Sequence, residues 1–241
     1  MKKIFFIGLF TVSFFSAHAQ TWFDVGLKGG MGAGFTINKV VNSDSRFDLL
    51  PQMNYFYGGK LGVNFGEKIG FDIDIDYGTY AYGFSQAKIV NQNQSLTYTY
   101  KIGFNAMSFM PTFRYTNEAS YLEIGFQYSI LKNQWVDDGV NSGYLINRVA
   151  SNSKQLVFGF GGHMVGNDVI ALMMGLRFSY AVSDLTAPDY LSSNFPFTNY
   201  QDIIGHTPTN RLNTQLVIEL NYSLGYLVRA SCGRRTAFLS F

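Results

Sequence analysis

Charge, proline, cysteine and long apolar runs are all scarce in this sequence of 241 residues. Charged residues make up 14% of the chain, against about 25% in typical soluble domains, which is unusual for a water-soluble enzyme. The single cysteine excludes a disulfide framework and a cysteine-based zinc site. Disorder is excluded as well, because a disordered chain has few aromatic residues and this one has 17%. Beyond the N-terminal region, the longest apolar stretch, residues 169–176, ends at Arg177, so membrane-spanning helices are not expected.

The N-terminus has the pattern of a cleavable signal peptide. Lys2 and Lys3 precede an apolar run over residues 4–15, and the segment 17–19 (AHA) provides a cleavage site. We expect residues 1–19 to be removed, so that the mature chain begins at Gln20 without a lipid-modified cysteine. An uncleaved membrane anchor is the alternative, although the apolar run is shorter than the roughly 20 residues that a spanning helix needs.

The formal charge of +2 comes from the signal peptide. Of 18 basic residues, Lys2 and Lys3 are removed, which leaves 16 basic against 16 acidic residues in the mature chain. A neutral chain without a basic cluster has no electrostatic basis for binding nucleic acid.

In the mature chain, apolar residues alternate with polar residues or glycine. This period of two predicts β-strands with one apolar and one polar face. In the fourth segment the apolar positions shift by one near Ala106 and Met107, which predicts a β-bulge. The eight predicted strands cover residues 23–37, 53–65, 69–82, 95–115, 121–131, 155–165, 169–182 and 212–226.

The connections between the predicted strands alternate in length. Short connections cover residues 66–68, 116–118 and 166–168, whereas long ones cover residues 38–51, 85–94, 136–152 and 183–211. Tight turns on one rim and long loops on the other are typical of a transmembrane β-barrel. We therefore predict an all-β fold, an eight-stranded antiparallel transmembrane β-barrel with a filled lumen, over residues 20–228, followed by a short periplasmic tail over residues 229–241. An even strand number puts both termini in the periplasm, where the signal peptide delivers the chain.

A soluble β-sandwich is the alternative, because alternation alone does not say which face is buried. The polar faces carry glycine, serine and asparagine with few charges, which suits the narrow lumen of eight strands. Aromatic residues near the predicted rims favour two interfacial girdles, one with Trp22, Tyr115 and Tyr121 and the other with Trp135, Tyr98, Tyr100 and Tyr180.

Charges of both signs occur in nearly equal number on the predicted inward face. We expect them to pair as a structural network that fills the lumen, because an unpaired buried charge is costly. A narrow polar path for ions or small solutes is the alternative interpretation. The residues are Asp24, Lys28, Lys60, Asp72, Asp74, Asp76, Lys101, Arg114, Glu123, Arg177 and Glu219.

Two patterns that could carry chemistry are weak. The alternating aspartates of segment 72–76 resemble a calcium loop, but Tyr77 and Gly83 stand where an EF-hand needs glycine and glutamate. The two histidines of the mature chain are His163, predicted inward, and His206, in the longest loop. Neither lies beside an outward serine that it could activate. We therefore expect no metal, no cofactor and no enzymatic activity.

Three segments carry a resemblance to a known family: residues 23–30 (FDVGLKGG), residues 57–62 (YGGKLG) and the terminal Phe241. With them, essentially the whole mature chain resembles the PorT-like outer-membrane β-barrel family of Gram-negative envelopes. The resemblance implies that the barrel-assembly machinery inserts the chain and reads a C-terminal aromatic residue. The basic tail after the last predicted strand departs from that pattern. Some relatives serve in protein secretion or as accessory subunits of envelope machines.

We therefore expect an integral outer-membrane protein in contact with outer-membrane lipid. Its expected role is non-enzymatic, structural or accessory, as a subunit of an envelope or protein-secretion complex. The alternative is a narrow passive channel or solute-uptake porin, because a fold does not fix a function. The loop 183–211 is the candidate contact surface for a partner, since exposed aromatic residues mark binding sites; its aromatic residues are Tyr190, Phe195, Phe197 and Tyr200.

Overall fold

The chain folds into eight long antiparallel strands and a few short elements. The computed structural model describes residues 21–91, 94–117, 119–137, 142–144, 148–167, 169–191 and 205–224; the predicted signal peptide and C-terminal tail lie outside these residues. The long strands are β1 (Thr21–Asn38), β3 (Gln52–Phe65), β4 (Ile69–Asn91), β5 (Gln94–Asn117), β6 (Ser120–Asp137), β8 (Asn152–Gly166), β9 (Ile170–Ala181) and β10 (Thr209–Ser223). The short elements are α2 (Lys39–Ser43), β2 (Phe47–Leu50), β7 (Ser142–Tyr144) and the 3-10 helix η1 (Pro188–Tyr190).

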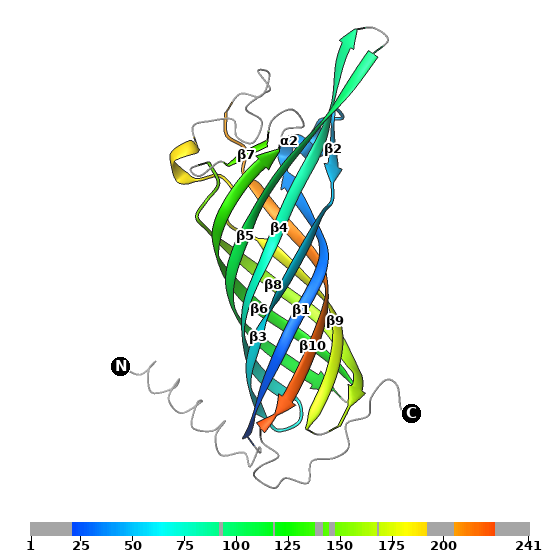
Figure 1. The fold of residues 1–241 in the computed structure, drawn as a ribbon, viewed down its shortest axis with the longest axis vertical. Coiled ribbons are helices and arrows are strands. Elements are labelled where there is room, and N and C mark those ends of the chain that lie inside the picture. The colour runs from blue at the N-terminus through cyan, green and yellow to red at the C-terminus, as the bar shows by residue number, and fades with distance from the viewer. Residues whose placement is uncertain are drawn as a thin grey trace, which may run out of the picture.

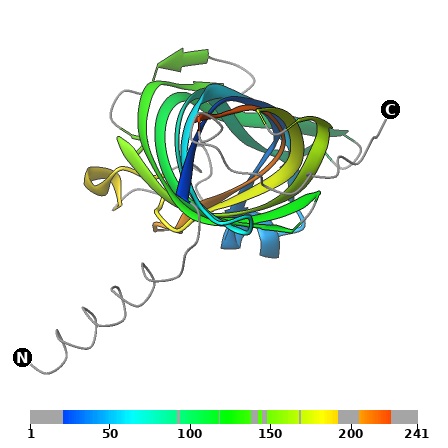
Figure 2. The same ribbon diagram turned by 90° about the horizontal axis from the view of Figure 1, so that it is seen from below.

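The eight long strands close into a barrel. Each pairs with its neighbour in chain order, and β1 pairs with β10 from Asp24 opposite Ser223 to Asn38 opposite Thr209. Figure 1 shows the tilted strands from the side, and Figure 2 shows the closed ring along its axis. The prediction of an eight-stranded antiparallel β-barrel is confirmed.

The two rims differ as the loop lengths predict. β1 begins and β10 ends at the rim with the short turns, whereas α2, β2 and β7 lie at the other rim (Figure 1). We call these the short-turn rim and the loop rim. None of the helices among the described residues has the length and hydropathy that a membrane-spanning helix needs.

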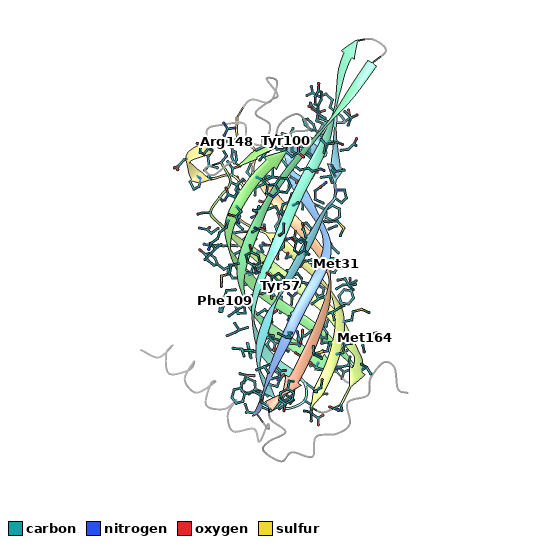
Figure 3. All side chains as sticks on the ribbon, viewed as in Figure 1. Met31, Tyr57, Tyr100, Phe109, Arg148 and Met164 are labelled. Carbon is teal, nitrogen blue, oxygen red and sulfur yellow. The ribbon has the colours of Figure 1, made fainter. Side chains whose placement is uncertain are left out.

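The outer surface of the barrel is apolar around its middle. Leu27 is 69% exposed, Ile124 61% and Tyr57 60%, and Figure 3 places Met31, Tyr57 and Phe109 on this part of the wall. Such a continuous apolar surface is unfavourable in water and is the lipid-facing band of a transmembrane barrel. The apolar faces therefore point out of the closed ring, which excludes the soluble sandwich.

At the edge of this band nearer the loop rim, the apolar face of β4 and β5 changes from the outside of the barrel to the inside. Up to Tyr77 the apolar residues of β4 point outward, whereas Tyr82 and Phe84, beyond Thr79, point inward and are 1% exposed. In β5, Phe104 is likewise buried and Met107 exposed. Strands that leave the lipid need a polar outside and an apolar inside, as in a soluble protein.

This change of face makes the predicted bulge near Ala106 and Met107 wrong. The pairing of β4 with β5 runs without a shift through both residues. The apolar positions change face because the surroundings of the barrel change from lipid to water. The alternation of inward and outward residues along the backbone continues without a shift. A register shift lies instead between β5 and β6, next to Gly103, where β6 holds one extra residue and Asn133 has a φ of 50°.

The predicted long loop at residues 85–94 is also wrong. β4 extends to Asn91 and β5 begins at Gln94, so the two strands form a hairpin that projects beyond the loop rim (Figure 1). β2 pairs with the other edge of β4, where Phe47 lies opposite Gln86. The polar residues of this segment indicated a loop, but a strand outside the lipid can carry polar side chains on its exposed face.

The predicted girdles keep only some of their members. Tyr121 and Tyr100 are buried inside the barrel, and the Tyr121 ring lies 4.5 Å from the guanidinium carbon of Arg114. Tyr115, at the short-turn rim, does face outward. The last strand ends at Ser223, whereas the predicted end, Tyr226, lies outside the described residues.

Candidate functional site: the filled lumen

Ten charged side chains gather in the part of the lumen nearer the short-turn rim. They come from seven of the eight wall strands, because every second residue of a strand points inward. All ten side chains are buried. We call them the lumen network: Asp24 and Lys28 of β1, Lys60 of β3, Asp72, Asp74 and Asp76 of β4, Arg114 of β5, Glu123 of β6, Arg177 of β9 and Glu219 of β10.

Arg114 contacts three carboxylates of the network. Its Nη1 and Nη2 donate to the two carboxylate oxygens of Glu219 at 2.8 and 2.9 Å. Nη2 also donates to Glu123 at 3.0 Å, and Nε lies 3.1 Å from Asp72. One guanidinium thus holds carboxylates from three strands, which its planar fork of donors allows.

Arg177 of β9 also contacts three carboxylates. Its Nε donates to Glu123 at 2.9 Å and its Nη2 donates to Asp74 at 3.0 Å. Its Nη1 lies 3.8 Å from Asp76. Glu123 is therefore held between the two arginines.

The two lysines complete the connections. Lys28 Nζ lies 2.6 Å from Asp74 and 3.2 Å from Glu219. Lys60 Nζ lies 2.8 Å from Glu219, with Asp24 and Asp72 at 3.5 and 3.6 Å. Every cation of the network thus contacts at least two carboxylates, as buried charges require.

Lys101 does not join the network. It lies on the outward phase of β5 opposite Gly83 and Asp137, and its side chain is half-buried. The prediction that it faces the lumen is wrong, because the assumed bulge placed this part of β5 in the opposite phase. The other ten predicted residues are brought together, and the aspartates of segment 72–76 contact these lysines and arginines.

Glycines on neighbouring strands make room for the network. A Cβ at Gly159 would lie 2.6 Å from the Glu123 carboxylate, and a Cβ at Gly62 would overlap the carboxylate of Asp24. The inward glycines thus keep space for longer charged side chains.

A layer of neutral polar groups lies above the charges. Asn213 Oδ1 accepts from Asn54 Nδ2 at 2.9 Å and from the Tyr82 hydroxyl at 2.7 Å. Its Nδ2 donates to Ser179 at 3.0 Å. Gln127 donates to Ser108 at 2.9 Å on the other wall, so this layer is also cross-linked.

An apolar plug fills the lumen near the loop rim, and sequence reasoning did not predict it. Phe104 stacks on Tyr82 with 5.8 Å between ring centroids, and Phe84 stacks on Tyr100 at 5.2 Å. Leu185, from the β9–β10 connection, belongs to the same buried cluster and is fully buried. The signal in the sequence was the even-numbered apolar set of segments 80–84 and 100–104, which belongs inside.

Arg211 is buried in the same region and was also not predicted. Its Nη2 donates to Ser153 at 2.6 Å, and its guanidinium carbon lies 5.4 Å from the centre of the Phe104 ring. Cation–π contact with the plug thus holds this charge.

A small pocket of about 30 Å³ opens at the short-turn rim, below the network. Trp22, Asn64, His163 and Asn221 line it together with Asp24. His163, predicted inward, is buried there.

The connection between β9 and β10 is fixed at its base. Asp184 Oδ1 accepts from the backbone N–H of Thr186 and of Thr209, and His206 Nε2 lies 2.6 Å from Asp184 Oδ2. Tyr190 is half-buried, with the Arg148 guanidinium 6.0 Å from its ring centre. The other aromatic residues of the predicted contact loop, Phe195, Phe197 and Tyr200, lie outside the described residues.

Comparisons with known proteins place the chain. No curated protein matches it. One similar solved structure is the outer membrane protein AlkL, with 8% sequence identity, coverage of 90% of this chain and 95% of that chain, and a TM-score of 0.42. Another is Neisserial surface protein A, with 12% identity, coverage of 83% of this chain and 96% of that chain, and a TM-score of 0.39. A third is the outer membrane protease OmpT of Escherichia coli, with 10% identity, coverage of 85% of this chain and 96% of that chain, and a TM-score of 0.35. The family model described as outer membrane protein beta-barrel domain matches residues 18–187. The chain therefore belongs to this family and is a β-barrel protein of the outer membrane.

Proposed function

We propose that this barrel is sealed and acts as a non-enzymatic accessory protein of the envelope. The observation that carries the proposal is the pair of ionic contacts across the lumen, Arg114 with Glu219 and Arg177 with Asp74. Each joins strands four places apart in a ring of eight, and therefore opposite walls. The apolar plug closes the lumen a second time, nearer the loop rim.

A sealed lumen does not support the alternative role as a narrow passive channel. A solute would have to separate buried ion pairs, and removing one partner of a buried pair costs roughly 3 to 5 kcal/mol. Liposomes that contain the purified barrel should therefore swell in sugar solutions no faster than empty liposomes. Swelling at the rate of a porin would overturn the sealed barrel.

The accessory role rests on the surfaces that remain. The loop rim carries α2, β2, β7 and the projecting β4–β5 hairpin (Figure 1), which together form a large folded surface outside the lipid. The PorT-like resemblance supports a subunit of an envelope or protein-secretion complex. On this proposal the loop rim faces the cell exterior, both termini face the periplasm, and the partner binds at the loop rim.

Co-purification from mild detergent tests this role. The test variant replaces part of loop 183–211. Its base must stay, because Asp184, Leu185 and Arg211 belong to the barrel. Replacing only residues 192–204 by a glycine-serine linker should remove the partner, while substitution of Lys68 by glutamine at the short-turn rim should retain it. Equal recovery of the same partner with both variants would contradict the assigned surface.

A further inference from the structure

A sector of positive charge lies where the apolar band ends towards the loop rim. On each wall strand we take the first outward residue beyond the last exposed apolar side chain. On β9 it is Asp184, whose carboxylate is held by His206 and by a backbone N–H. On five strands it is uncharged: Ala33 after β1's Met31, Pro51 after β3's Met53, Thr79 on β4, Asn105 on β5 and Thr214 on β10. On the paired strands β6 and β8 it is a lysine, Lys132 after Ile130 and Lys154 after Leu156.

The two lysines share one patch of the outer wall. Lys154 lies directly opposite Tyr128 of β6, and Lys132 is two outward positions further along the same strand. Both lysine side chains are exposed, and Tyr128 is 37% exposed beside them. Lys132 is also opposite Asn105 of β5, the residue at which β5 changes polarity.

These lysines differ from those of the lumen in their partners. Lys28 and Lys60 each contact two or more carboxylates, whereas the described part of the chain gives Lys132 and Lys154 no ion pair. Their ammonium groups are thus available to a ligand from outside the chain.

The height of the patch fixes the chemistry of that ligand. A lysine at the edge of a lipid-facing band extends its aliphatic stem along apolar surface and places its ammonium among the headgroups. Tyrosine prefers the same depth. Lysine binds phosphate as a point charge, and a basic residue near an anionic membrane surface contributes about 1 kcal/mol.

We propose that Lys132 and Lys154 bind the phosphate groups of an outer-leaflet glycolipid, on the face of the barrel formed by β6 and β8. The site goes beyond the sealed-barrel function and depends on the proposed orientation, with the loop rim outward. It gives this face a preferred lipid neighbour, and the neutral edge residues of β4, β5 and β10 lack such a site.

Native mass spectrometry of the purified full-length mature barrel in detergent tests the proposal. The probes are bisphosphorylated lipid A, the same lipid without phosphates, and phosphatidylglycerol. The double variant Lys132→Gln/Lys154→Gln should bind bisphosphorylated lipid A about 30-fold more weakly, the effect of roughly 1 kcal/mol per lysine. Lys132→Arg/Lys154→Arg should retain binding, as should Lys68→Gln at the opposite rim.

Three other results would each overturn the proposed site. Equal binding of phosphorylated and phosphate-free lipid A would show that phosphate is not recognised. Equal loss in Lys68→Gln would show a general charge effect. Stronger lysine-dependent binding of phosphatidylglycerol than of lipid A would contradict the outer-leaflet source. Heat-modifiable migration on gels confirms that each variant is folded, and the swelling of liposomes tests the sealed lumen independently.

Discussion

Arg114 and Glu219 meet across the full width of the lumen, with two parallel hydrogen bonds of 2.8 and 2.9 Å between β5 and β10. β10 is also the strand that closes the ring against β1. The contact therefore links the closing strand to the opposite wall. In a barrel this narrow, the same side chains that fill the lumen also hold the ring together.

Replacing Arg114 by methionine should strongly destabilise the barrel. The change leaves Glu219, Glu123 and Asp72 with less compensation, so we expect a loss of about 3 to 5 kcal/mol in the free energy of unfolding. Urea unfolding in lipid vesicles measures it. The double variant Arg114→Met/Glu219→Gln should lose less than the sum of the two single variants, because the two residues share one interaction.

Arg46→Gln provides the matched control. Arg46 also pairs with a carboxylate, Asp44 at 2.7 Å, but this pair is exposed near the loop rim, and its hydrogen bonds lower the pKa of Asp44. Exposed pairs contribute about 0 to 1 kcal/mol. A loss with Arg46→Gln equal to that of Arg114→Met would contradict the special role of the lumen network.

Gly62→Ala should destabilise the barrel although the residue only gains a methyl group. The new Cβ would overlap the Asp24 carboxylate and displace it from Lys60, at a cost of about 1 to 3 kcal/mol. Gly29→Ala on the neighbouring strand is the control, because its Cβ would meet only the Phe56 carbonyl oxygen at 3.6 Å. Equal unfolding midpoints for the two variants would show that the network tolerates the added atom.

Labelling of cysteine variants in intact cells tests the orientation. In a Cys232→Ser background, Thr97→Cys places a thiol at an exposed site of the projecting hairpin, and Glu67→Cys places one in a short turn. A membrane-impermeant maleimide should label the first and not the second. The reverse pattern would place the loop rim in the periplasm.

The sequence predicted the barrel well because one physical rule governs its middle. Between the two edges of the apolar band, every outward residue meets lipid and every inward residue meets the lumen, so the period of two is clear in segments such as 69–77. Ten of the eleven proposed lumen charges, from Asp24 to Glu219, follow from this period alone.

The same rule fails at the loop rim, where water replaces lipid. Beyond Thr79 and Asn105 the apolar residues belong inside, and a pattern judged by polarity alone then suggests a bulge that the backbone does not have. Lys101 was assigned to the wrong face for this reason. The specific partners within the network, such as Arg177 with Asp74 across the lumen, depend on barrel closure and rotamers, which no local pattern contains.

Single-channel recording in planar lipid bilayers tests the sealed lumen most directly. The wild-type barrel should give no stable conductance steps, and the variant Arg114→Ala/Arg177→Ala, which removes both contacts across the lumen, should conduct more than the wild type if it folds. Heat-modifiable migration confirms folding before insertion. Steady porin-like conductance of the wild-type barrel would contradict the account.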